Sequence, residues 1–153
     1  MKPKAYKIYM DACCFCRPFD DRIQKRVIQE IEAIESILEQ SFKAGWTIFS
    51  SDALNYEILT PSYSCKSEVL KLYRTSTNEH LRLSETIKKR ASALEKAGMR
   101  SLDSIHLALA ENFGADIFLT TDDRLLAAAK RLKIKLQTSN PTSWLKEIAR
   151  NDH

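Results

Sequence analysis

The stretch 101–130 reads SLDSIHLALAENFGADIFLTTDDRLLAAAK and holds a helix, a strand and a second helix in direct succession. LDSIHLALAENF is apolar on most of a helical circumference, which predicts a buried helix with Ser101 as its N-cap and Gly114 just past its end. ADIFLTT (115–121) then predicts a strand, and DDRLLAAAKRLK (122–133) predicts the next helix. A strand between two helices in this order indicates an α/β fold.

The same alternation extends over the rest of the chain. Further strands are predicted at AYKIYM (5–10), WTIFS (46–50), LRL near residue 82 and KIKLQT (133–138). Further helices are predicted up to Gly45, from Ser50 or Ser51 to Leu59, over about 64–75, over ETIKKRASALEKAG (85–98) and from Asn140 and Pro141 onward. Strands that alternate with helices predict a parallel sheet covered by helices on both faces.

The segment after the first strand is expected to form a turn and then a long helix. CRPFDD (16–21) predicts the turn because Pro18 fixes one backbone angle. Asp21 and Gln24 have the spacing of a capping box, which predicts the start of a helix that ends at Gly45. Its apolar face would carry Ile23, Val27, Ile31, Ile34, Leu38 and Phe42.

Length and composition predict one compact domain, which we place at residues 1–150. The chain has 153 residues, 44% of them hydrophobic, which is enough for a single core. The net charge of +4 is compatible with a polyanionic partner, and equally with an ordinary, slightly basic soluble protein. Because the chain has only three glycines, we exclude nucleotide-binding folds that depend on a glycine-rich phosphate loop.

The sequence also bears on the cellular compartment. It has no continuous apolar leader, and no stretch approaches the roughly 20 apolar residues that a membrane span needs. Three of the four cysteines, Cys13, Cys14 and Cys16, are clustered, which is a poor framework for the disulfides of a secreted fold. We therefore expect a cytoplasmic protein with reduced thiols and no membrane partner.

Four acidic residues stand at the edges of otherwise apolar segments. Asp11 follows KIYM, Glu57 lies in ALNYEIL, Asp103 lies in LDSIHLALA and Asp122 follows DIFLTT. Ligand sites of parallel sheets lie beyond the carboxyl ends of the strands, where Asp11 and Asp122 are expected. Each acid taken alone is explained better by helix capping or by a solvated surface. Four carboxylates that converge would instead require a cation, because a buried charge without a partner is costly.

Carboxylate oxygens are hard ligands that suit Mg²⁺ or Mn²⁺. Such ions typically accept only one or two protein carboxylates and leave room for water and for substrate phosphate. They can activate a water molecule and stabilise the departing oxygen of a phosphodiester. The acidic pattern therefore predicts metal-dependent hydrolysis of a nucleic acid, most plausibly RNA.

IYMDACC, NYEIL, RSLDSIHLALA and FLTTDDRLL, in this order, resemble the acidic motifs of PIN-domain ribonucleases, particularly the VapC-type toxins of toxin–antitoxin pairs. The resemblance spans nearly the whole chain and implies a three-layer α/β/α sandwich with a central parallel sheet. It also implies an endoribonuclease that uses Mg²⁺ or Mn²⁺, acts as the toxin of a type II system, forms a homodimer and is inhibited by a cognate antitoxin. Carried over by position, the metal-site acids would be Asp11, Glu57, Asp103 and Asp122, with Asp123 as an auxiliary acid and Thr120 as a supporting hydrogen-bonding residue.

Three nearby features have other interpretations. Cys13 stands where the family often has Asn or Ser, and a thiol is a weak hydrogen-bond partner. His106 lies three residues after Asp103, but we assign it to packing because a hard cation gains little from imidazole. Arg17, Arg100 and Arg124 could hold phosphates without specifying a sequence, and Arg124 could equally pair with a neighbouring Asp.

Two other functions stay open. A PIN-like domain could bind a protein or RNA without cleaving it, although all four acids are present. A phosphatase of the haloacid dehalogenase type also has an Asp after its first strand, but it normally needs a second Asp two positions later. This chain has Cys13 at that position, which makes the phosphatase the weaker alternative.

Overall fold

The structure is a computed structural model that describes residues 4–151. Five strands lie within this range: β1 Lys7–Met10, β2 Thr47–Ser51, β3 Glu79–Leu81, β4 Ile117–Leu119 and β5 Thr138–Ser139. The helices are α1 Ala12–Cys16, the 3₁₀ helix η1 Arg17–Phe19, α2 Lys25–Ala44, α3 Asp52–Leu59, α4 Lys66–Ser76, α5 Glu85–Lys96, α6 Ser101–Asn112, α7 Asp123–Arg131 and α8 Pro141–Asn151. Within residues 4–151 no helix combines the length and apolar character needed to cross a membrane.

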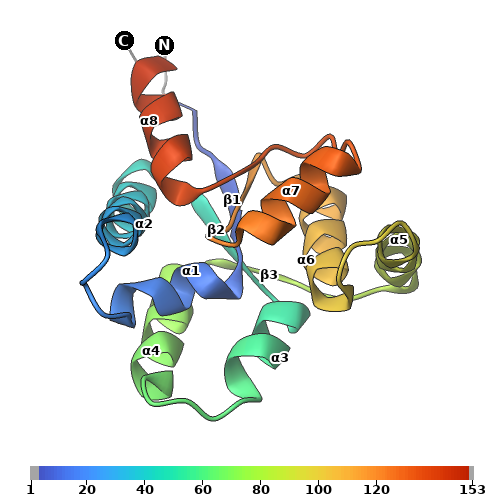
Figure 1. Cartoon of the computed structure of the whole chain (residues 1–153), viewed down its shortest axis with the longest axis horizontal. Helices are drawn as coiled ribbons and strands as arrows, with labels where there is room; N and C mark the ends of the chain where they lie inside the picture. The colour runs from blue at the N-terminus through green and yellow to red at the C-terminus, as the bar shows by residue number, and fades with distance from the viewer. Residues whose placement is uncertain (1–3, 152–153) are drawn as a thin grey trace.

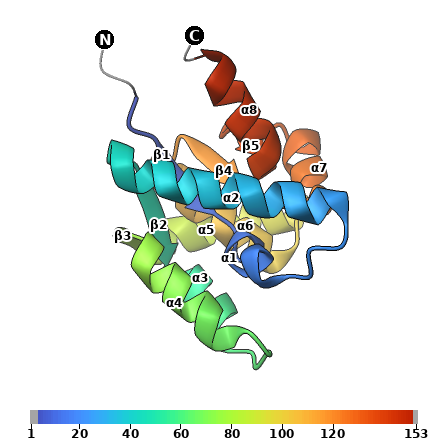
Figure 2. The ribbon, with the colours of Figure 1, turned by 90° about the vertical axis from the view of Figure 1, so that its left-hand side faces the viewer.

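The five strands form one sheet in the order β3-β2-β1-β4-β5, and every pairing is parallel. Figure 1 shows α2 and α8 on one side of this sheet and α5, α6 and α7 on the other. Figure 2, turned by a quarter, shows α2 running across the near side of the strands. The predicted α/β class and parallel sheet are confirmed, and the layers are those of an α/β/α sandwich.

The strand order reverses between β1 and β4. The chain builds β1, β2 and β3 toward one edge, then returns to place β4 and β5 on the other side of β1. In such sheets ligands bind where the order reverses, beyond the carboxyl ends of the strands. Met10 pairs with Leu119, and the amide of Asp11 donates to the carbonyl of Leu119 at 2.9 Å. The residues that follow β1 and β4 therefore meet at the switch point of the sheet.

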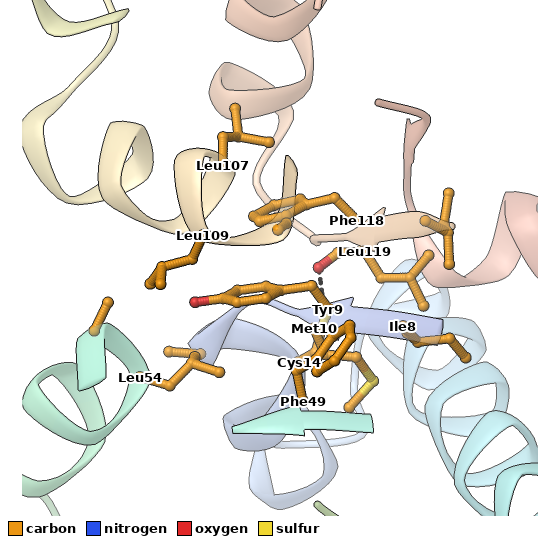
Figure 3. Packing of buried hydrophobic residues seen from close by; sticks show 14 of the residues in the cluster. Ile8, Tyr9, Met10, Cys14, Phe49, Leu54, Leu107, Leu109, Phe118 and Leu119 are labelled. Carbon is orange, nitrogen blue, oxygen red and sulfur yellow. Dashed lines mark hydrogen bonds between the residues drawn. The ribbon is translucent and has the colours of Figure 1, made fainter. Parts of the chain in front are cut away.

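The core around β1 fixes this meeting point. Tyr9 of β1 stacks on Phe118 of β4, with ring centroids 5.3 Å apart (Figure 3). Cys14 of α1 packs beneath β1, and its thiol donates to the carbonyl of Leu119 at 3.5 Å. Ile8, Tyr9 and Met10 are fully buried. Helices cover both faces of β1, which explains why the strand reads as a continuous apolar run.

The segment between β1 and α2 differs from its prediction. Instead of a simple turn, it forms α1 and then η1, which contains Pro18. The helix starts early because the side chain of Asp11 caps it. The capping box at Asp21 and Gln24 is wrong, since α2 begins at Lys25 and Gln24 makes no side-chain cap. Gly45, in the left-handed region, ends α2 as predicted.

The apolar face predicted for α2 is correct only in its centre. Ile31 and Ile34 are fully buried, whereas Ile23 is 83% exposed and Phe42 is 92% exposed. Ile23 precedes the helix and Phe42 lies in its last turn, so the sheet covers neither. The buried face includes the carboxylate of Glu30 in addition to apolar residues.

Glu30 anchors an ionic network that reaches the residues following β4. Its carboxylate pairs with Arg17 and Arg26, each at 3.1 Å, and accepts from the side chain of Asn140 at 2.6 Å. Arg26 also donates to the carbonyl of Thr121 at 3.2 Å. Because these contacts join η1, α2, α8 and the end of β4, they fix the position of the chain where it leaves β4.

Three boundaries in the second half also differ from prediction. Ser101 lies inside α6, whose N-cap is Arg100, so Ser101 is not a cap. The strand expected near residue 82 is β3, which ends at Leu81. KIKLQT contributes only Thr138 to a strand, because Lys133 adopts a positive φ of 55° and turns the chain there.

Candidate metal centre

Asp11 is the central acid of the site. It follows β1 and is only 6% exposed. Its Oδ1 accepts the amide of Ala12 at 2.8 Å, and its Oδ2 accepts the hydroxyl of Thr120 at 2.9 Å. Burial raises the pKa of Asp11, against the opposing effect of nearby His106. The fold thus holds this carboxylate in a fixed orientation at an electrostatic cost.

Glu57 and His106 complete a compact group with Asp11. Glu57 lies on α3, and its Oε1 is 2.7 Å from Nε2 of His106 on α6. The same Nε2 is 3.9 Å from Oδ1 of Asp11. One ligand atom from each of the three side chains lies within 4.8 Å of the others. We call these three residues the Asp11 group.

A chain of hydrogen bonds supports the Asp11 group from inside the core. Nδ1 of the fully buried His106 is 2.6 Å from the hydroxyl of Tyr9, which is 2.8 Å from Oγ of Ser51. Burial raises the pKa of Tyr9 well above its ordinary value, so the phenol stays protonated. If Tyr9 donates to Nδ1, then Nε2 of His106 carries the proton and donates to Glu57. In this tautomer His106 orients Glu57 as a ligand.

Asp103 and Asp122 form a second pair, and the guanidinium of Arg100 offsets part of their negative charge. Arg100 donates from Nε to Asp103 at 2.8 Å and from Nη2 to Asp122. Burial raises the pKa of Asp103, in part offset by Arg100. For Asp122 burial acts in the same direction, but hydrogen bonds from Arg100 and from the amides at the start of α7 hold its pKa below the ordinary value. We call these two acids the Arg100 pair.

Thr120 connects the two groups. Its hydroxyl donates to Asp11 and accepts the amide of Asp122 at 3.1 Å, while its own amide binds the carbonyl of Ser139. It is fully buried. Asp122 in turn caps α7 by accepting the amides of Arg124 and Leu125. The hydrogen bond that the resemblance implied for Thr120 is therefore present, and it holds Asp11.

Asp123 does not join this site. Its side chain is 70% exposed and pairs with Arg26 of α2 at 2.8 Å. The physical reason is the start of α7, where Asp122 turns its carboxylate back as the N-cap and Asp123 becomes the first helical residue on the outer side. The auxiliary metal role expected for Asp123 is not supported by its position.

Cys13 touches the acids directly. Its sulfur is 3.5 Å from Oδ2 of Asp11 and 3.4 Å from the hydroxyl of Thr120, and it accepts the amide of Thr121 at 3.4 Å. The thiol thus occupies the polar position that an Asn or Ser would take, with longer contacts. All four cysteines carry free thiols.

Sequence reasoning missed the contributions of His106 and Arg100. His106 was assigned to packing, yet it bonds to Glu57 and lies beside Asp11. Arg100 was considered only as a phosphate-binding residue, yet it bridges Asp103 and Asp122. His106 lies three positions after Asp103 on the predicted helix, and this spacing was the available signal for it. Arg100 lies just before the predicted start of that helix, three positions before Asp103.

The donor set of the Asp11 group fits a divalent cation. Asp11 and Glu57 supply the carboxylate oxygens that Mg²⁺ and Mn²⁺ prefer, and no Arg or Lys is hydrogen-bonded to either within residues 4–151. A cation would relieve the cost of the buried charge on Asp11. The Arg100 pair has less need of one, because a guanidinium already lies between its carboxylates.

Comparison with known proteins does not identify a family. No protein-family model matches the chain, and no curated protein matches it. Its function is therefore argued from the geometry of the two acidic groups and from the motif resemblance.

Proposed function

We propose that this protein is an endoribonuclease that uses Mg²⁺ or Mn²⁺ to hydrolyse RNA phosphodiester bonds, and that it is the toxin of a type II toxin–antitoxin pair. The observation that carries the proposal is the Asp11 group, whose ligand atoms lie within 4.8 Å of one another at the switch point of a parallel sheet. The Arg100 pair is joined to it through Thr120. Order and spacing of the acidic motifs support the ribonuclease class.

Asp11 and Glu57 would hold the ion. When bound, the ion would activate water and stabilise the charge that develops on the phosphate and its leaving oxygen. Thr120 and the amide of Ala12 keep both oxygens of Asp11 oriented. In the tautomer that carries its proton on Nε2, His106 would donate to Glu57 and keep it oriented.

The Arg100 pair has a separate place in the proposal. Asp103 is half-buried beside the Asp11 group, where Asp11 contributes to the raised pKa of its carboxyl. Asp103 and Asp122 would extend the acidic edge along which phosphate and water are held. Arg100 fixes the separation of their carboxylates. The cytoplasmic location, the homodimer and the antitoxin belong to the same proposal and rest on the motif resemblance.

The test is cleavage of a mixed pool of structured and single-stranded RNA in Mn²⁺, in Mg²⁺ or in EDTA. The wild type is compared with Asp11→Asn and with Asp123→Asn, a matched change on the exposed acid outside the site. We expect cleavage by the wild type and by Asp123→Asn only with metal, and none by Asp11→Asn.

Each other outcome has a defined meaning. Cleavage by Asp11→Asn at the wild-type rate would contradict the assignment of the site. If no RNA is cut in any metal although the protein binds RNA, the non-cleaving alternative is favoured. For the toxin role, induced wild type should arrest bacterial growth and Asp11→Asn should not; unaffected growth with wild type would refute it.

A further inference from the structure

A cavity of about 350 Å³ opens directly beside the Arg100 pair. It lies between α7 and the connection from α5 to α6. Its lining residues are Gly98, Arg100, Asp103, Arg124, Ala127, Ala128 and Arg131. Since Asp103 is in the wall, the cavity is continuous with the acidic edge, and three of its seven lining residues are arginines.

Two of these arginines keep their charge available. Arg100 is engaged with Asp103 and Asp122, but Arg124 and Arg131 form no side-chain hydrogen bond or ion pair with any residue between 4 and 151. Both are exposed. By contrast, Arg90 binds Glu111 through two hydrogen bonds. The pairing of Arg124 with a neighbouring Asp, left open by the sequence, does not occur among the described residues.

The guanidinium of Arg131 lies close to the α5–α6 connection. A Cβ built on Gly98 would lie 3.7 Å from Nη2 of Arg131. Arg131 therefore reaches back across the cavity from the end of α7, while Arg124 stands at the start of the same helix. Small residues, Ala127 and Ala128, lie between them and leave the cavity open.

We propose that this cavity binds a backbone phosphate of the RNA strand next to the one held at the metal centre. This inference rests on the proposed function, because it takes the strand to lie along the acidic edge. A polyanion beside carboxylates needs cationic groups at close range, and guanidinium groups suit phosphate oxygens because they bind them in pairs. Such a contact fixes the position of the strand without reading its sequence.

The test measures binding in EDTA, so that cleavage does not interfere. The probe is a fluorescein-labelled, single-stranded RNA of mixed sequence, titrated at several salt concentrations with wild type and with the double variant Arg124→Ala, Arg131→Ala. The matched control is the double variant Arg74→Ala, Arg150→Ala. These two arginines lie on α4 and α8, are exposed and form no ion pair with any residue between 4 and 151.

We expect the Arg124/Arg131 variant to bind at least about tenfold more weakly and to lose about 0.7 from the slope of log K against log salt, which is the value for one phosphate contact to a single strand. The control should lose less than about threefold, through net charge alone. Single-stranded DNA should show the same difference between variants, since phosphate contacts do not require the 2′-hydroxyl.

The results separate this inference from the proposed function. Equal losses in both double variants, or no RNA binding by the wild type at low salt, would overturn the phosphate site whether or not the protein cleaves RNA. Arg124- and Arg131-dependent binding without metal-dependent cleavage would support the phosphate site and refute the nuclease. Metal-dependent cleavage by a protein whose RNA binding does not depend on Arg124 and Arg131 would support the nuclease and refute the phosphate site.

Discussion

The Asp11 group and the Arg100 pair are neighbouring sets of carboxylates that handle their charge in opposite ways. Asp11 is buried and bonded only to neutral donors, and Glu57 is oriented by an imidazole. Asp103 and Asp122 share a guanidinium that is half exposed to solvent. The first set leaves its negative charge for a ligand to neutralise, and in the second a single guanidinium offsets one of the two negative charges.

This difference indicates at which group a metal ion should bind with the higher affinity. A buried carboxylate without a cation destabilises the fold, so a bound ion returns that free energy as affinity. A carboxylate already paired with arginine offers less, because the ion must compete with the guanidinium. We therefore expect the Asp11 group to be the primary metal site.

The largest effect on metal affinity should come from substituting Asp11, and the matched substitution in the second set is Asp103→Asn. Asp11→Asn is expected to weaken Mn²⁺ binding by more than about 100-fold, since even changes to residues that support metal ligands cost roughly 10- to 100-fold. Asp103→Asn should cost less than about tenfold. Isothermal titration calorimetry with Mn²⁺ measures both, and equal losses would remove the distinction between the two sets.

The hydrogen-bond chain behind Glu57 gives the next effect. His106→Gln should weaken Mn²⁺ binding by about 10- to 100-fold and destabilise the protein by about 1–3 kcal/mol, because buried polar groups lose their partner. Tyr9→Phe, which removes one hydroxyl from the same chain, should cost about 1 kcal/mol and less of the affinity. Calorimetry and urea unfolding give the two quantities. Unchanged Mn²⁺ affinity in folded His106→Gln would show that Glu57 needs no support from the imidazole.

Removing Arg100 should leave Asp103 and Asp122 without a cationic partner, as Asp11 and Glu57 are, and so make them better metal ligands. Arg100→Ala is expected to raise the Mn²⁺ affinity of the Arg100 pair by about tenfold, equivalent to about 1.4 kcal/mol, and to reveal a second binding event in calorimetry. The matched control is Arg90→Ala, which breaks a comparable ion pair with Glu111 away from the acids. A titration with Arg100→Ala that equals that of the control would show that the guanidinium does not compete with metal.

Asp11 and Asp122 should also respond to pH with opposite signs. Burial raises the pKa of Asp11 in the folded state, so its ionisation destabilises the metal-free protein as pH rises from the unfolded value of about 3.9 through the folded one. The pKa of Asp122 is lowered, so its ionised form stabilises the fold at neutral pH and this contribution is lost as pH falls through the lowered value.

Asn substitutions isolate these contributions. In EDTA, Asp11→Asn should gain stability relative to wild type as pH rises, whereas Asp122→Asn should lose it. Each difference is expected to reach a few degrees in melting temperature, at about 2–4 °C per kcal/mol for a domain of this size. Thermal unfolding from about pH 3 to pH 8 tests both, and slopes of the same sign would contradict the contrast.

Local signals in the sequence were sufficient for most of the fold. The cap at Ser51, the left-handed Gly45 and the cap at Asn140 depend on residues close in the chain, and the structure has all three. The capping box at Asp21 failed because α2 begins at Lys25, so that Gln24 is the N-cap rather than a residue of the first turn. KIKLQT failed as a strand because the chain turns at Lys133 and only Thr138 of this segment pairs with β4.

The site was predictable only in part. Asp11, Glu57, Asp103 and Asp122 were recognised from their positions at the edges of apolar segments. Their division into two sets was not, because it depends on how α3 packs against α6 and on which way the side chain of Arg100 turns. His106 faces Glu57 across 49 residues of sequence, a contact that no local pattern encodes.

The hydrogen bond between Thr120 and Asp11 joins residues 109 positions apart. During synthesis, β1 and α1 emerge long before β4, so the oxygens of Asp11 cannot reach their final arrangement until about four-fifths of the chain has left the ribosome. Pairings this distant in sequence also form slowly. In the nascent protein the proposed metal site would therefore be incomplete for most of translation, and it would form late, when β4 is inserted beside β1.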